Sequence, residues 1–247
     1  MASTKKDKHL NVRSVTRSLI ATFGHQTLGN KRNPFDELIF IILSSKTPPE
    51  RYQLTYSALK DKYPSVDQLA RARPSAIARV IEAGGLAEKK ARQISAIARA
   101  LVWVFGRVTL TPLTRMNDQQ AEEFLDTLPG VGKKTARCVL MYSLGRPVFP
   151  VDAHCFRISQ RLGWTSKNSN LTDRVADELQ AGIPPELRRD LHVGMVLLGR
   201  EYCQPRNMHC LECPLLKFCP TGQEKHSIHG RRQLSLQREP LLSAKDR

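Results

Sequence analysis

Apolar residues recur at helical spacing along most of this chain. Over residues 9–23 they lie three and four positions apart on one face, at Val12, Val15, Leu19, Ile20 and Phe23. The stretch 87–105 follows the same pattern, at Ala91, Ile94, Ile97, Ala98, Leu101, Val102 and Phe105. Shorter patterns predict helices at 50–62, 66–71, 75–82, 153–162, 172–181 and 186–202. No segment alternates convincingly as a strand does, so an all-α fold is predicted.

The segment 34–43 differs because it is apolar nearly all round, with Phe35, Leu38, Ile39, Ile41, Ile42 and Leu43. A helix of this kind belongs in the middle of a core. The same Ile-rich run also fits a buried strand, and the pattern leaves both open.

A short Gly-rich turn, Leu128-Pro129-Gly130-Val131-Gly132, joins two predicted helices. The first begins at Asn117 or Asp118, and the second runs from about residue 133 to 144. A turn with a Gly at each end places backbone N–H groups at a helix N-terminus, which is a geometry that binds phosphate.

Lys133 and Lys134 occupy the first turn of that second helix, where cations are unfavourable to the helix dipole. Their presence indicates a role beyond helix stability. Asp152 follows 18 residues after Lys134, just past Pro150, where the chain changes direction. Two simpler interpretations stay open: a lysine after a Gly turn is often only a phosphate contact, and Asp152 can simply cap a helix beginning at Ala153.

The chain of 247 residues is strongly basic, with 39 Lys and Arg against 23 Asp and Glu and a net charge of +16. This excess is typical of a nucleic-acid binder, although an acidic protein or a membrane surface is an alternative partner. There is no run of about 18 apolar residues and no apolar leader, so we expect a cytoplasmic protein without a membrane span.

Four of the six cysteines lie close together as C-x6-C-x2-C-x5-C, namely Cys203, Cys210, Cys213 and Cys219. Four thiolates in one loop suit zinc or a [4Fe–4S] cluster, and their spacing leaves the two open. Cys138 and Cys155 are predicted to be small core residues. Residues 222–247 lose apolar periodicity and are predicted to form a mobile tail.

The segments LPGVGKKTA and VDAHCFRI resemble the helix-hairpin-helix base-excision DNA glycosylases, and the endonuclease III group in particular. The resemblance implies that Lys134 is the catalytic lysine, that Asp152 is the catalytic aspartate, and that Lys133 faces the DNA backbone. It places the hairpin residues Leu128, Gly130, Val131 and Gly132 against DNA. It also favours a helix for residues 34–43 and a [4Fe–4S] cluster held by Cys203, Cys210, Cys213 and Cys219.

The fold that the resemblance implies consists of two helical lobes flanking a DNA-binding cleft. A six-helix barrel would span residues 27–146 and end in the hairpin. Residues 1–26 and 147–221 would form the cluster domain. The expected activity is removal of damaged pyrimidines, oxidised ones foremost, with lyase cleavage at the abasic site, by a monomer acting on double-stranded DNA.

One stretch departs from the family. Relatives carry a Ser-x-Gln stretch after the apolar helix, and its glutamine fills the gap left by the flipped base. Here Lys46 stands at that place, in Ser45-Lys46-Thr47-Pro48-Pro49, and we expect it to reach the DNA stack. The substitution keeps open a mismatch- or methylated-pyrimidine-specific glycosylase. A non-catalytic DNA-binding iron–sulfur protein and a zinc-stabilised adaptor are the remaining alternatives.

Overall fold

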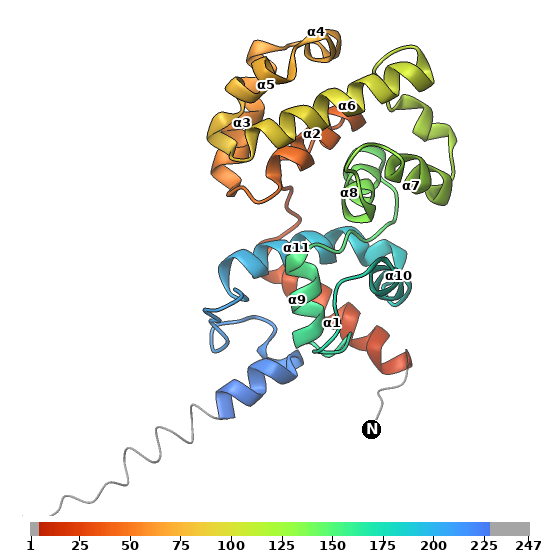
Figure 1. The fold of residues 1–247 in the computed structure, drawn as a ribbon. Helices are drawn as coiled ribbons and strands as arrows, with labels where there is room; N and C mark the ends of the chain where they lie inside the picture. Colours follow the sequence, from red (N-terminus) through yellow and green to blue (C-terminus); the bar gives the residue numbers. More distant parts are fainter. Residues whose placement is uncertain (1–4, 228–247) are drawn as a thin grey trace, which may run out of the picture. The chain divides into compact units, whose positions relative to one another are not determined.

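A computed structural model describes residues 5–227 of the chain, with side chains from residue 11 onward. All regular structure in this range is helical, apart from one isolated bridge between Cys203 and Met208, which confirms the all-α prediction (Figure 1). None of the described helices is both long and apolar enough to cross a membrane. The chain divides into two compact units, one of residues Thr27–Pro150 and one that joins Met1–Gln26 to Val151–Arg247. The division falls at 150/151, four residues after the position expected from the sequence.

The centre of the 27–150 unit is α2 (Pro34–Ser44), whose apolar residues are buried on all sides. Asn33 caps it, because its side-chain Oδ1 accepts hydrogen bonds from Phe35 N at 2.9 Å and Asp36 N at 3.1 Å. Pro34 takes the first helical position, where its missing N–H costs nothing. These start signals explain why the Ile-rich segment is a helix and not the alternative buried strand.

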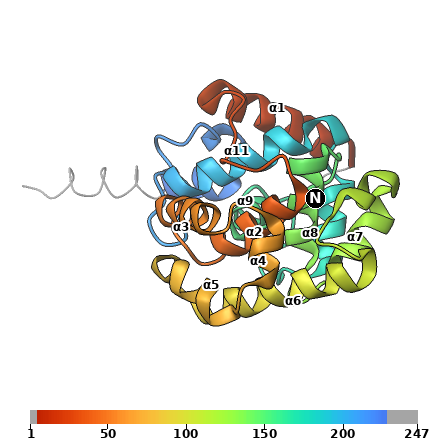
Figure 2. The ribbon, with the colours of Figure 1, turned by 90° about the horizontal axis from the view of Figure 1, so that it is seen from above.

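Around α2 the unit places six further helices: α3 (Pro49–Lys62), α4 (Val66–Arg71), α5 (Pro74–Val80), α6 (Ala87–Phe105), α7 (Asp118–Asp126) and α8 (Lys133–Leu144). Helix α2 packs against α3, α6 and α8, and α5 packs along α6 (Figure 2). The resemblance implied six helices, whereas this unit has seven. Pro74 separates α4 from α5, since a residue before proline disfavours helical backbone and Arg73 is extended.

The second unit is built around α11 (Arg188–Glu201), which packs against α1 (Lys5–Phe23) and α9 (Ala153–Arg161). Helix α10 (Asp173–Ala181) completes it. The contact of α11 with α1 is close, because a Cβ at Gly194 would lie only 2.8 Å from Leu19 Cβ. A larger residue at Gly194 would therefore force the two helices apart.

Residues 220–227, which include the first residues of the predicted tail, are helical. This helix starts at the last cysteine of the loop, where Gln223 N donates to Cys219 O at 3.0 Å. A Pro at position 220 has its backbone angle preset for a first turn, and that start signal needs no apolar face. Residues 228–247 of the predicted tail lie outside the described residues.

Candidate functional site

The hairpin between α7 and α8 is a tight turn with a buried base. Val131 N donates to Leu128 O at 3.0 Å, and Gly130 has φ +69°, as the third residue of a type II turn requires. Leu128 and Val131 are buried, whereas Pro129 and Gly130 between them are exposed. Gly132 then precedes α8 with extended backbone and offers no side-chain cap. The N-terminal turn of α8 is therefore not covered by a capping side chain, as anion binding requires.

The side chain of Gln93 on α6 is hydrogen-bonded to this turn. Its Nε2 donates to Gly130 O at 2.9 Å, and a Cβ at Gly130 would lie 2.9 Å from that same nitrogen. The backbone angle therefore requires glycine at position 130, and a Cβ there would also displace the Gln93 amide. Sequence reasoning missed Gln93, because 37 residues separate it from the turn that it contacts.

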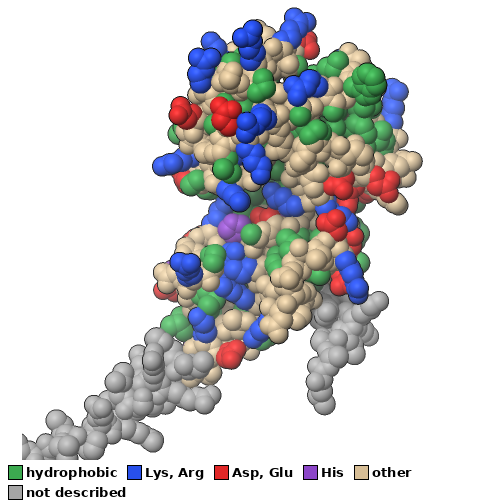
Figure 3. Space-filling model, viewed as in Figure 1, with side chains coloured by type: hydrophobic (Ala, Val, Ile, Leu, Met, Phe, Trp, Pro, Cys, Tyr) green, Lys and Arg blue, Asp and Glu red, His purple; other side chains and the backbone are tan. Residues whose placement is uncertain are grey.

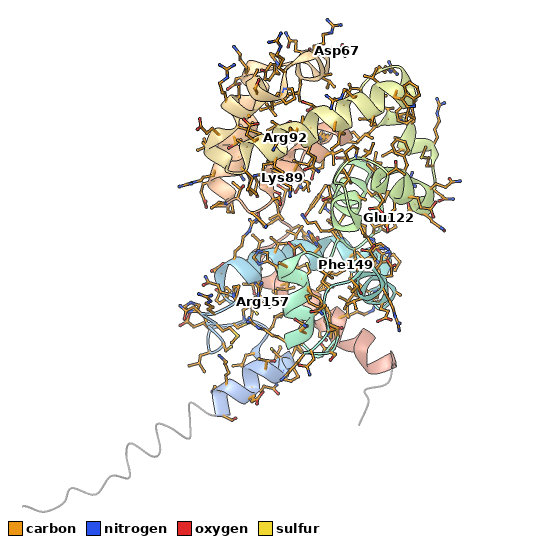
Figure 4. All side chains as sticks on the ribbon, in the orientation of Figure 1. Asp67, Lys89, Arg92, Glu122, Phe149 and Arg157 are labelled. Atoms are coloured by element: carbon orange, nitrogen blue, oxygen red, sulfur yellow. The ribbon has the colours of Figure 1, made fainter. Side chains whose placement is uncertain are left out.

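Lys133, the first residue of α8, lies near a carboxylate on α7. Its Nζ is 3.7 Å from Glu122 Oε1, and its side chain is 19% exposed. Arg137, one turn later, donates from Nε to Glu122 Oε2 at 2.8 Å and from Nη2 to Oε1 at 3.2 Å. Glu122 is labelled on α7 in Figure 4. The carboxylate therefore ties the two hairpin helices together, and a phosphate at Lys133 would share the lysine with it.

Lys134 is the second residue of α8 and is partly exposed. It is electrostatically coupled to Glu37, a fully buried carboxyl on α2. Glu37 accepts hydrogen bonds from Asn30 Nδ2 at 2.5 Å and from Lys31 N at 2.6 Å. Burial raises the pKa of Glu37 from 4.5 to about 7, against these hydrogen bonds and the charges of Lys31 and Lys134.

Asp152 caps α9, since its Oδ1 accepts a hydrogen bond from Cys155 N at 2.8 Å. The simpler interpretation of this aspartate, a helix cap, is thereby confirmed, and it is compatible with a second role. Asp152 belongs to the unit beginning at Val151, whereas Lys134 belongs to the 27–150 unit. The chain joins the two units only two residues before Asp152.

The four clustered cysteines line one small cavity in the second unit. Arg161 Nη1 lies 3.0 Å from Cys203 Sγ, and Gly222 N lies 3.4 Å from Cys219 Sγ. Burial raises the pKa of the Cys213 thiol to about 11 and also raises that of Cys219. Such thiols need a bound cation to ionise, and donors aimed at the sulfurs are a device that tunes metal–thiolate groups.

Among the residues that the structure describes, no three His, Cys, Asp or Glu side chains are grouped so as to hold one metal ion. Cys138 and Cys155 do not line the cavity, are buried and form no disulfide, as predicted for core residues. The four thiols around one cavity are thus the donor set for any thiolate-bound group.

Lys46 is exposed and has φ +53°, an uncommon backbone angle for a residue with a side chain. On the face shown in Figure 3, Lys and Arg side chains spread over α3 to α6, and acidic side chains gather at α7. The basic face is consistent with the net charge of +16.

The sequence profile of the HhH-GPD superfamily base excision DNA repair proteins matches residues 39–185. The chain belongs to this family. This HhH-GPD chain is 35% identical over 187 residues to the Endonuclease III of Thermotoga maritima, covering 76% of the chain and 83% of the relative. It is 33% identical over 194 residues to the Endonuclease III of Synechocystis, covering 78% and 83%. A structure titled as a non-covalent Endonuclease III–DNA complex matches with a TM-score of 0.77 and 26% identity, covering 92% of this chain and 100% of that one.

Sequence reasoning also missed Leu86 in this HhH-GPD chain. Leu86 is a large apolar residue with 52% of its surface exposed, directly after Gly84-Gly85. Its φ is +53°, the same value as that of Lys46. A glycine pair followed by an exposed leucine at the start of a helix was the available signal.

Proposed function

We propose that this base-excision repair protein is a bifunctional DNA glycosylase and abasic-site lyase that removes damaged pyrimidines, oxidised ones foremost, from double-stranded DNA. The observation that carries the proposal is the place of Lys134, in the first turn of an uncapped helix directly after the hairpin turn. The relatives named Endonuclease III support it. The protein acts as a monomer.

The hairpin binds the DNA backbone through its main chain. Peptide N–H groups at the exposed start of α8 point toward an anion, and the helix dipole favours negative charge there. Leu128 and Val131 contribute by anchoring the turn in the core, and Gly130 and Gly132 by letting a phosphate approach closely. Lys133 adds a positive charge beside the phosphate.

The target nucleotide leaves the stack, because its glycosidic carbon is inaccessible inside a duplex. The neutral Lys134 amine attacks the sugar C1′, the bond from C1′ to the base breaks, and the base leaves with the bonding electrons and takes up a proton. The nitrogen gives up one proton and forms a second bond to C1′ as the C1′–O4′ bond of the sugar ring breaks, O4′ takes up a proton, and a protonated imine results. The imine makes the C2′ proton acidic, so that its removal expels the 3′ phosphate and cuts the strand.

Asp152 stabilises the positive charge that develops on the sugar and accepts or returns protons. Its Oδ1 is already held by the Cys155 N–H at 2.8 Å, which fixes the direction of the carboxylate. The cap role and the catalytic role thus serve each other, since a fixed carboxylate stabilises charge without reorganising.

Cys203, Cys210, Cys213 and Cys219 fit a [4Fe–4S] cluster and would be its four ligands. The fit rests on four thiols around one cavity, with the donors of Arg161 and Gly222 aimed at sulfur. When bound, the cluster cross-links a loop that is too short to be held by burial. The loop then presents basic residues, among them Arg206 and Lys217, to DNA phosphates.

Borohydride trapping on an abasic duplex tests the proposal, because borohydride reduces the imine to a stable covalent adduct. The wild-type protein is expected to be trapped and to nick the strand, and Lys134→Ala to do neither. Lys133→Ala is the matched control, which removes the neighbouring cation and should still be trapped. If Lys134→Ala traps and nicks normally, Lys134 is not the nucleophile. If the wild type binds DNA but never traps, the non-catalytic DNA-binding alternative replaces the enzyme.

One observation favours a second candidate function, a glycosylase specific for mismatched or methylated pyrimidines: the exposed Lys46 stands where relatives carry a glutamine. A lysine only donates hydrogen bonds, whereas an amide also accepts them. Comparing duplexes that carry thymine glycol, a uracil–guanine mismatch or a methylated pyrimidine separates the two candidates. Preference for the mismatch or the methylated base would replace oxidised pyrimidines as the substrate.

A further inference from the structure

Two residues other than glycine have a positive φ among the described residues, Lys46 and Leu86, both at +53°. Lys46 is the third residue of a type II turn, in which Thr47 N donates to Ser44 O at 3.2 Å. That position normally belongs to glycine, because a Cβ there is strained. Strained backbone persists only where its surroundings hold it, and it gathers at functional sites.

A buried lysine connects the two strained segments, in addition to a direct hydrogen bond from Thr47 Oγ1 to Gly84 O at 2.6 Å. Lys90 on α6 is 4% exposed, and its Nζ donates to Leu43 O at 2.8 Å, to Thr47 Oγ1 at 2.7 Å and to Gly84 O at 3.1 Å. Leu43 and Thr47 flank Lys46, and Gly84 precedes Leu86 by two residues. The backbone N–H of Lys90 also donates to Leu86 O at 3.0 Å.

The three Nζ partners of Lys90 are neutral oxygens, so no carboxylate among them offsets the buried charge. Burial accordingly lowers the pKa of Lys90. A methionine of similar length would fill the same space without this cost. Only the ammonium group offers three hydrogen-bond donors, and with them it binds both exposed segments at once.

We propose that Lys90 is a positioning residue that holds Lys46 and Leu86 as one preformed pair for insertion into the DNA base stack. The proposal rests on the proposed function, because only an enzyme that extrudes a nucleotide needs the pair. Leu86 supplies an exposed apolar wedge of the kind that separates base steps, and Lys46 supplies donors for the base left without a partner. Holding both in place in advance avoids the cost of ordering two loops upon binding.

The test substitutes Lys90→Met, which removes the donors and keeps the apolar stem. The matched control is Lys89→Met, which removes an exposed charge from the neighbouring position on α6 (Figure 4). Two substrates are compared, a duplex with a damaged base and a single-stranded abasic oligonucleotide. The single strand requires the lyase chemistry but has no stack to enter. We expect Lys90→Met to lose about tenfold more activity on the duplex than on the single strand. Lys89→Met should change the activities on the two substrates by the same factor.

A double-mutant cycle separates positioning from a general structural effect. Leu86→Ala in the wild-type background should lower duplex activity by about tenfold, whereas in the Lys90→Met background it should lower it by less than about twofold. Fluorescence of 2-aminopurine opposite the lesion reports stack opening directly, and its rise upon binding should disappear in Lys90→Met. Equal Leu86→Ala effects in both backgrounds, or an unchanged fluorescence rise, would overturn the proposal.

Thr47→Val supplies the test if Lys90→Met does not fold, since it nearly preserves the side-chain volume but removes one Lys90 partner together with the direct Thr47–Gly84 hydrogen bond. It should weaken the Leu86→Ala effect in the same direction, and an undiminished effect would again overturn the proposal. A wild-type protein without lyase activity on the single strand would instead refute the proposed function. The two failures are therefore distinguishable.

Discussion

Because the carboxyl of Glu37 is buried, we predict that the free energy of unfolding depends on pH. Burial raises its pKa from 4.5 to about 7 in the folded protein. Between these two values the folded chain binds a proton that the unfolded chain releases, so the free energy of unfolding falls as the pH rises. The stabilising contribution is fully present below pH 4.5 and is lost as the pH rises through about 7.

The magnitude follows from the two pKa values. A difference of about 2.5 pKa units at about 1.4 kcal/mol each corresponds to roughly 3 kcal/mol between pH 4.5 and pH 7. Glu37→Gln is neutral at every pH and removes this slope. The substitution also removes one of the two oxygens that accept hydrogen bonds from Asn30 Nδ2 and Lys31 N. This lowers the free energy of unfolding by about 1–3 kcal/mol at every pH.

The assay is urea unfolding of both proteins from pH 5 to pH 8 at fixed ionic strength. The stability difference between wild type and Glu37→Gln should shrink with rising pH, by about 3 kcal/mol at most. Subtraction removes the contributions of other groups, such as His154, whose pKa is lowered chiefly by burial and whose effect has the opposite sign. Glu88→Gln, at an exposed position on α6, should retain the wild-type slope. A difference that stays flat across this range would refute the reasoning.

Three further predictions concern the turn, the cap and the cysteines. Gly130→Ala should destabilise the protein by more than about 1 kcal/mol in thermal unfolding and weaken DNA binding, because alanine is strained at φ +69° and meets Gln93; an unchanged melting temperature would contradict this. Asp152→Asn should preserve the melting temperature and lose activity, whereas Asp152→Ala should lose both, with a cap worth about 1 kcal/mol; an active Asp152→Asn would exclude a catalytic role. Cys213→Ser should abolish the visible absorbance near 400 nm and the iron content of anaerobically purified protein. The control Cys138→Ala should preserve both. A colourless wild-type protein with bound zinc would refute the cluster.

The helices were predictable because their signals are local. Asn33 followed by Pro34 begins α2, and capping boxes begin α4 at Ser65 and α7 at Asn117. Each of these signals lies within three residues of the helix that it starts. The hairpin turn was predictable for the same reason, since Pro and Gly occupy the positions that a type II turn requires.

The supports of the site were not predictable, because each joins residues that are distant in sequence. Lys90 reaches Leu43 across 47 positions, and Gln93 reaches Gly130 across 37. A lysine or glutamine in an amphipathic helix is ordinarily a surface residue, and only the folded structure reveals which distant backbone oxygen it binds. The burial of Glu37 could not be predicted either, because the pattern of α2 indicates only that the helix is apolar.

The two adjacent lysines of α8 are distinguished by what surrounds them. Successive helical residues point about 100° apart, so Lys133 and Lys134 face different neighbours. Lys133 lies in an ion pair with Glu122, which also binds Arg137, and is engaged there as a cation. Lys134 is coupled instead to Glu37, a carboxyl that remains protonated up to about pH 7 and carries its charge only above that pH. A nucleophilic amine must shed its proton, and a charged carboxylate partner opposes that loss. The ion pair of Lys133 with Glu122 is therefore consistent with the proposal that Lys134, not Lys133, is the nucleophile.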